Sequence, residues 1–346
     1  MKRETAMRAP RRQLGISLIE LLISIAIGLF LLVGVVSVFG NSHRVYHQLN
    51  QASQQIENGR MAVQMLADDI GLAGFYGRYY NLLSTPGAAP DPCETADMAA
   101  LRTASALVLQ GFDASRGSLT CVPAANYLAG TDVLVVRRAD STVTPLASLA
   151  AQQVYIQANA DPNDAGNPLI ALGTAANFTL QNKDTTIAPI RKYHVHVYFV
   201  SPCSIPTGGG TTCTGATDDG GTPIPTLKRL ELTIDPADGT RKMVVTPLVE
   251  GIENFQVDYG LDSDSDGSPN GAYVTAPALT DWQNVVAVRI SVLARHLLAD
   301  GDFTDSKTYD LGVAGTYTPS GAAVKYKRHV YNAVIRIVNP SSRRDS

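Results

Sequence analysis

The longest apolar segment of the chain runs from Ile16 to Gly40 and contains a single charged side chain, Glu20. As a helix this segment would span about 37 Å, which is enough to cross a bilayer. A carboxylate inside a bilayer costs up to about 2.5–3.5 kcal/mol at mid-depth, so Glu20 predicts a partner of opposite charge. Lysines and arginines precede the segment, and the positive-inside rule places that side in the cytoplasm.

After Gly40, apolar or small residues recur at alternating spacings of four and three, which predicts that the helix continues with one stripe for packing. The segment GLAGFYG, residues 71–77, contains three glycines and predicts the end of this helix. Packing of the stripe on a sheet is favoured over a free coiled coil, because alanine and glycine make a weak zipper. The predicted stripe consists of Val45, Leu49, Ala52, Ile56, Gly59, Val63, Leu66, Ile70 and Ala73.

The remainder of the chain alternates turn-rich inserts with short runs of β-branched and aromatic residues, which predicts an antiparallel sheet. In the run RKYHVHVYFV, His194, His196 and Tyr198 fall on one face of a strand. The predicted strands are 106–112, 132–138, 153–157, 192–200, 226–234, 242–248, 252–260, 285–294 and 330–338.

Composition supports a folded chain and excludes some classes of function. The chain has 346 residues, of which 45% are hydrophobic and 17% charged, with a net charge of −3. No basic stripe is visible, so we expect no direct binding of nucleic acid. No nucleophile elbow, phosphate loop, dinucleotide fingerprint or metalloprotease motif is visible either, and we expect no enzymatic activity.

All four cysteines follow the apolar segment. An even number outside the cytoplasm favours disulfides, and four cysteines allow three connectivities. We expect the local pairing, Cys93 with Cys121 and Cys203 with Cys213. A zinc site is the alternative, although no C-x-x-C spacing supports it.

The stretch GISLIE, residues 15–20, resembles the class III signal of type IV prepilins and pseudopilins. The resemblance implies that a membrane peptidase cleaves after Gly15, that the new terminus at Ile16 is methylated, and that Glu20 is an assembly residue. A cleaved secretory signal would have a shorter core and a small-residue cleavage site. A plain membrane anchor would leave Glu20 unexplained.

The closer resemblance is to PilW-type minor pilins, through VEGIENFQVDYGLDSDSDG (249–267), NVVAVRISVLAR (284–295) and RHVYNAVIRIVN (328–339). It implies an α+β pilin fold, with a long N-terminal helix packed on an elaborated antiparallel sheet. The expected regions are a leader at 1–15, a transmembrane and filament-core helix at 16–40, an amphipathic continuation at 41–75 and a globular β-rich region at 76–346.

The resemblance also implies a cellular location and partner proteins. We expect insertion in the inner membrane with the globular region in the periplasm, followed by incorporation at or near the pilus tip. The implied partners are other minor pilins, the major pilin, the prepilin peptidase, the inner-membrane assembly platform and a tip adhesin. Two alternatives stay open, a type II secretion pseudopilin and an adhesin that binds a surface ligand directly.

One loop, GLDSDSDGSPNGAY, matches the opening of a calcium-binding loop. Asp262, Asp264 and Asp266 alternate before a glycine, as carboxylate ligands at positions 1, 3 and 5 would. Tyr273 replaces the glutamate expected at position 12, so Asp258 or Asp281 would have to contribute, and an acidic hairpin turn is the alternative. His43 with His47, and His194 with His196, are spaced for joint metal ligation, but neither pair has an evident third ligand.

Overall fold

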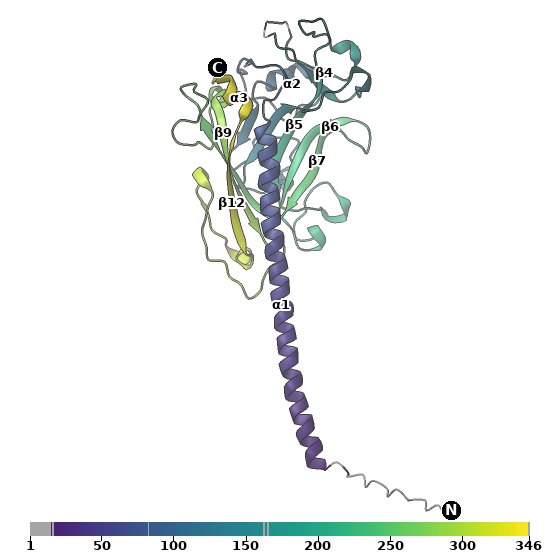
Figure 1. Cartoon of the computed structure of the whole chain (residues 1–346), viewed down its shortest axis with the longest axis vertical. Helices are drawn as coiled ribbons and strands as arrows, with labels where there is room; N and C mark the ends of the chain where they lie inside the picture. The colour runs from purple at the N-terminus through teal and green to yellow at the C-terminus, as the bar shows by residue number, and fades with distance from the viewer. Residues whose placement is uncertain (1–14, 16, 82, 162, 165, 345–346) are drawn as a thin grey trace, which may run out of the picture. The chain divides into compact units, whose positions relative to one another are not determined.

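The computed structural model describes residues 15, 17–81, 83–161, 163–164 and 166–344 (Figure 1). The chain divides into two compact units, Met1–Ala52 and Ser53–Ser346. Helix α1 begins at Leu18 and ends at Gly71, so it contributes residues to both units. This confirms the predicted long helix and its end at the glycine-rich segment.

In the first unit the described residues form helix α1 after a short lead. Residues 17–50 are all exposed within the chain. The helix is long and apolar enough, by length and composition, to cross a membrane. Ser24 and Ser37 donate their hydroxyl hydrogens to the carbonyls of Glu20 and Val33, four residues earlier, at 2.7 and 2.8 Å. These polar side chains are therefore satisfied within the helix itself.

In the second unit α1 packs against the sheet residues, but its buried stripe differs from the predicted one. Gly59, Leu66 and Ile70 are buried as predicted. Ile56 is 50% exposed, so the prediction was wrong there, whereas Val63 is partly buried and packs against the core. The helix turns Gln55, Ala62 and Asp69 inward instead. Polar partners decide this rotation, since Gln55 donates to the carbonyls of Ala294 and Lys327 at 2.7 and 3.1 Å.

The described residues of the second unit form three antiparallel sheets. The largest has seven strands in the order β1-β2-β5-β3-β4, with β6 paired to β5 and β7 paired to β6. A three-stranded sheet has the order β12-β9-β8, and β10 pairs with β11. The strands are β1 (Leu109–Phe112), β2 (Val133–Ala139), β3 (Val154–Gln157), β4 (Leu169–Leu172), β5 (Ile190–Ser201), β6 (Thr226–Ile234), β7 (Arg241–Glu250), β8 (Ile252–Leu261), β9 (Val285–Arg295), β10 (Tyr309–Asp310), β11 (Thr316–Tyr317) and β12 (Arg328–Arg336).

All nine predicted strands are present, although most bounds differ by a few residues. The last prediction, 330–338, was wrong at its end, because β12 stops at Arg336 and helix α3 begins at Val338 and ends at Arg344. Helix α2, Met98–Ala104, and strands β4, β10 and β11 were not predicted. These elements are short, so periodicity gives little signal for them.

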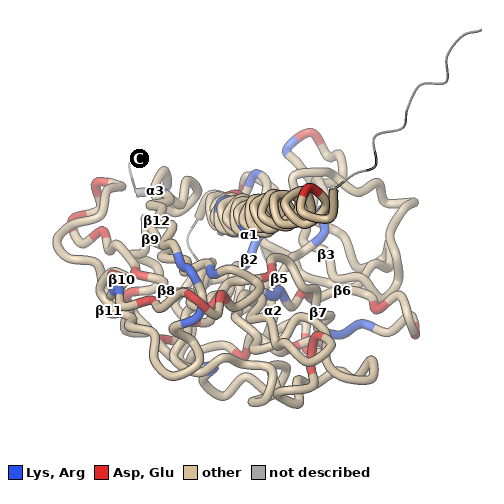
Figure 2. Tube along the Cα trace, turned by 90° about the horizontal axis from the view of Figure 1, so that it is seen from below, with Lys and Arg blue, Asp and Glu red and all other residues tan. Residues whose placement is uncertain are grey.

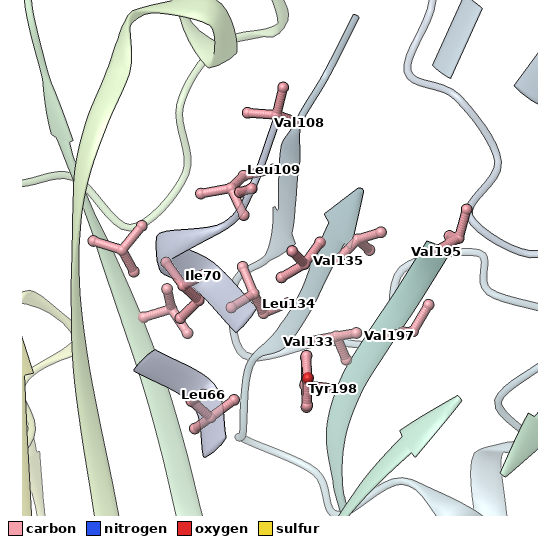
Figure 3. Close-up of a cluster of buried hydrophobic side chains, with 14 of the residues drawn as sticks. Leu66, Ile70, Val108, Leu109, Val133, Leu134, Val135, Val195, Val197 and Tyr198 are labelled. Atoms are coloured by element: carbon pink, nitrogen blue, oxygen red, sulfur yellow. The ribbon is translucent and has the colours of Figure 1, made fainter. Parts of the chain in front are cut away.

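The core lies between α1 and the sheets. Figure 3 shows Leu66 and Ile70 of α1 beside Leu109 of β1 and Leu134 of β2, and all four side chains have no exposed surface. Full burial of each such side chain contributes about 1.5–3 kcal/mol. The same hydrophobic cluster extends to residues of β5, β8 and β9. The predicted packing of the helix on a β-rich region is thereby confirmed.

Both predicted disulfides are present, Cys93–Cys121 and Cys203–Cys213. Each closes a local loop, because the bonded cysteines are 28 and 10 residues apart in the sequence. Loops of this size are stabilised by roughly 2–4 kcal/mol when cross-linked, chiefly through the unfolded chain. The zinc alternative for the cysteines is wrong, because all four thiols are oxidised.

Candidate functional site

The N-terminal motif lies at the start of α1. Gly15 is exposed and precedes the helix, and Glu20 lies in the first turn. A carboxylate there interacts favourably with the helix dipole, by about 0.3–1 kcal/mol. Residues 1–14 and Ile16 lie outside the described residues. Cleavage after Gly15 and methylation of Ile16 therefore stay predictions.

The apolar surface that follows this motif is extensive. Its large aliphatic and aromatic side chains between Leu18 and Phe39 are 51–84% exposed. Contiguous apolar surface on this scale marks a membrane or protein contact. With the serine hydroxyls bonded to their own helix, Glu20 is the one side chain of this stretch whose charge requires a partner outside it.

Three glycines of this helix, Gly28, Gly34 and Gly40, face open space among the residues that the structure describes. A Cβ atom added at any of them would meet nothing within 4 Å beyond its chain neighbours and the adjacent helix backbone. His43 and His47 lie nearby on the helix with their rings 4.6 Å apart. Among the residues that the structure describes, neither belongs to a group of three potential metal ligands.

In the second unit a buried polar cluster joins α1 to the large sheet. Asp69 of α1 is 5% exposed and accepts three side-chain hydrogen bonds. Arg138 of β2 donates to its Oδ1 at 2.6 Å, while His196 Nδ1 and the Tyr198 hydroxyl of β5 lie 2.7 and 2.9 Å from its Oδ2. The helix is thus fixed to two neighbouring strands through one carboxylate.

The electrostatics of this cluster favour charged partners. Burial raises the pKa of Asp69, but hydrogen bonding and charge from His196 and Arg138 outweigh it and hold that pKa well below its usual range. Burial lowers the pKa of His196, but its hydrogen bond to Asp69 and the nearby Glu231 carboxylate outweigh burial and raise that pKa above its ordinary value. Sequence reasoning noticed the histidines but missed Asp69, which lies beside the predicted stripe position Ile70.

The acidic loop does bring its three aspartates together. One carboxylate oxygen of each of Asp262, Asp264 and Asp266 lies within 4.8 Å of the others. Asp262 is fully buried and accepts from the backbone N–H groups of Ser265 and Gly267 at 2.7 and 3.1 Å. This carboxylate therefore caps its own loop, which the hairpin-turn alternative also requires.

The other residues relevant to a calcium site in this loop are Asp258, Tyr273 and Asp281. Asp258 is buried and pairs with Arg289 at 2.7 Å, so its Oδ2 atom is committed to that ion pair. The Tyr273 ring lies beneath the same guanidinium, 5.2 Å from its carbon atom. Asp281 lies in a short 3-10 helix, Leu279–Asn284. The calcium site stays a prediction.

Charge is mixed across the second unit. Figure 2 shows Lys and Arg residues interspersed with Asp and Glu residues along the trace of this unit. Several of these charges are paired deep in the structure. The fully buried guanidinium of Arg328, for example, binds both Glu253 and Asp305 at 2.5 and 3.0 Å. Buried pairs of this kind account for charged residues inside the core.

Comparison with known families gives two matches. The family model described as Type IV Pilus-assembly protein W matches residues 214–339, which include β6 to β12 and the acidic loop. The model described as the prokaryotic N-terminal methylation motif matches residues 10–36, which include Gly15 and Glu20. No curated protein and no solved structure matches the chain. The two matches lie at opposite ends of the sequence, one in each unit.

Proposed function

We propose that the chain, whose two family matches support a PilW-like minor pilin of the type IV pilus, primes pilus assembly and joins the complex at the pilus tip. The observation that carries this proposal is the exposed apolar half of α1 with one carboxylate in its first turn. Such a surface needs a bilayer before assembly and a bundle of similar helices afterwards. Adhesion, twitching motility and DNA uptake would follow from the filament rather than from chemistry in this chain.

The proposed mechanism pairs charges between subunits. Cleavage after Gly15 would free a positive α-amino group at Ile16, one helical turn before Glu20. In a staggered bundle, Glu20 of one subunit would meet the amine of its neighbour. Attraction between the two charges is strengthened by the low dielectric of the helix bundle. The pairing would also offset the cost of holding each charge away from water.

The second unit would supply the surfaces that select partners. We propose other minor pilins, the major pilin and a tip adhesin as its contacts in the filament. The prepilin peptidase and the inner-membrane platform would act on the N-terminal part. Before assembly the chain would be held in the inner membrane, with the second unit in the periplasm.

Substitution of Glu20 tests the pairing. Glu20→Ala should be processed normally but enter pili poorly, measured as the amount of this chain in sheared pili and as filament number per cell. Ser24→Ala serves as the matched control, because it removes only a bond within the helix. Normal filament numbers in Glu20→Ala would contradict the proposed role of the carboxylate.

Processing is tested separately at Gly15. Gly15→Ala should leave the full-length precursor in the membrane, detected by mass spectrometry of the intact protein. In the wild type the same measurement should find a methylated terminus at Ile16. Mature protein of normal mass in Gly15→Ala would refute the cleavage site.

The pseudopilin alternative predicts a different phenotype on deletion of the gene. A pseudopilin would be needed for protein secretion and dispensable for pili. We expect the reverse, a loss of pili with secretion intact. An adhesin acting alone would leave filament number unchanged while abolishing attachment.

A further inference from the structure

A second polar cluster lies beside Asp69, where β5 and β6 pair. His194 and His196 project from the same face of β5, and their ring centroids are 5.1 Å apart. Glu231 of β6 lies opposite His196 in the register of the two strands. Its Oε2 atom pairs with Arg229 at 2.9 Å, which leaves Oε1 directed at both histidines.

In each histidine, both ring nitrogens face a carboxylate oxygen, and the two oxygens come from different residues. His194 Nδ1 lies 3.2 Å from Glu231 Oε1, and its Nε2 lies 3.3 Å from Asp140 Oδ2. His196 Nδ1 lies 2.7 Å from Asp69 Oδ2, and its Nε2 lies 3.7 Å from Glu231 Oε1. A neutral imidazole has only one N–H group, so one nitrogen lone pair of each ring would face a carboxylate. A second proton on the ring, or a metal ion between the ring and the carboxylate, removes this conflict.

The geometry around Glu231 Oε1 fits a metal better than a proton. The His196 side chain is 2% exposed, and its buried Nε2 atom has no hydrogen-bond partner among the described residues. One ligand atom from each of His194, His196 and Glu231 lies within 4.8 Å of the others. Ligand atoms in a tetrahedral zinc site are separated by about 3.4 Å, given metal–ligand bonds near 2.0–2.1 Å. The two observed separations of 3.2 and 3.7 Å bracket that value.

The outer contacts match those of histidine metal sites. Metal-bound histidines donate their other ring N–H to a carboxylate, which fixes the tautomer and the ring orientation. Asp69 stands in that position for His196, and Asp140 stands in it for His194. Asp69 is itself held by Arg138, and Asp140 accepts from the backbone N–H of Thr142.

We propose that His194 Nδ1, His196 Nε2 and Glu231 Oε1 bind a divalent transition-metal ion with the ligand preferences of Zn²⁺. Two imidazoles and one carboxylate leave the fourth position for water. The ion would bridge β5 and β6 and, through His196 and Asp69, secure α1. Binding releases any proton held at the metal-facing nitrogens. The site concerns the second unit alone, and it stands whether or not the chain enters a filament.

The test uses full-length protein in detergent, stripped with a chelator and titrated with Zn²⁺ by calorimetry. We expect one equivalent to bind, and Co²⁺ to give the visible absorption of a tetrahedral site. Asp140→Asn should keep the stoichiometry and weaken affinity about 10–100-fold. His194→Gln and Glu231→Gln should each abolish binding at this site. His43→Gln with His47→Gln is the matched control and should leave it unchanged.

The chain has one tryptophan, Trp282, which lies in the second unit and is 7% exposed, so its fluorescence verifies folding of each variant. X-ray absorption of the zinc-loaded wild type needs no variant and should show two imidazole ligands. Failure of the wild type to bind would overturn the proposal. So would binding that persists in folded His194→Gln and Glu231→Gln, or an absorption spectrum without two imidazoles.

Discussion

The two parts of helix α1 are covalently continuous but differ in composition and in burial. In the first unit, the part from Leu18 to Gly40 is almost wholly apolar, yet its side chains are exposed within the chain. The part in the second unit is rich in polar residues, yet it buries Gln55 and Asp69 together with Leu66 and Ile70. Hydrophobicity alone therefore does not determine which face is buried. The apolar surface of the first part is available for a partner outside the chain. In the second part, hydrogen-bonded polar groups hold the helix against the sheet.

This contrast predicts that assembly and folding can be separated by substitution. Changes in the first part of α1 should alter filaments and leave the second unit intact. Changes in the second part should destabilise that unit. Urea unfolding of the full-length protein in detergent, followed by Trp282 fluorescence, measures the second effect alone.

The largest effect is expected for Asp69→Ala, which leaves the buried His196 and the partly buried Arg138 without this acceptor. Removing one member of a buried charged cluster costs about 3–5 kcal/mol of unfolding free energy. The adjacent Asp68→Ala is the control, since Asp68 is exposed and accepts a hydrogen bond from the neighbouring Gln64 side chain. Equal unfolding free energies for the two variants would contradict the structural role of Asp69.

Leu66→Ala comes next. Leu66 is fully buried, and truncation in a packed core costs about 2–5 kcal/mol. Leu31→Ala removes the same atoms from a side chain that is 67% exposed, and it should change the unfolding free energy by less than about 0.5 kcal/mol. Comparable losses in both variants would show that the two parts of α1 are not energetically distinct.

A smaller difference in unfolding free energy is expected between substitutions of two glycines in α1, Gly59 and Gly34. A Cβ atom at Gly59 would lie 2.1 Å from the Tyr331 ring, whereas one at Gly34 would meet nothing within 4 Å. Gly59→Ala should therefore destabilise the second unit by about 1–2 kcal/mol. Gly34→Ala should leave its unfolding curve unchanged. Combining Gly59→Ala with Tyr331→Ala should recover part of the loss, and additive losses would exclude the steric explanation.

The smallest effect concerns the acidic loop. If Asp262, Asp264 and Asp266 bind calcium, the ion should stabilise the second unit by about 1.4 kcal/mol at ten times its dissociation constant. Melting temperature with millimolar calcium or magnesium provides the measurement. Asp264→Asn with Asp266→Asn keeps the buried Asp262 cap and should remove the calcium shift. If calcium does not change the melting temperature, the calcium prediction is wrong and the loop is a hairpin turn.

Sequence patterns predicted the long helix, the main strands and both disulfides, because each is encoded by local spacing. The buried stripe was displaced toward Gln55 and Asp69, because their partners come from distant strands. Helix α2 had an available signal, since Asp97 caps it by accepting from Ala99 and Ala100. The pairing of Glu231 with His196 depends on strand register, which periodicity does not supply.

The two disulfides both close within the second unit, at some distance along the chain from the prepilin motif. Thiol oxidation and the proposed removal of the leader would therefore act on separate stretches of polypeptide, and neither reaction would need the other's product. A host deficient in oxidative folding should accumulate correctly trimmed chains whose β-rich portion is easily digested by proteases.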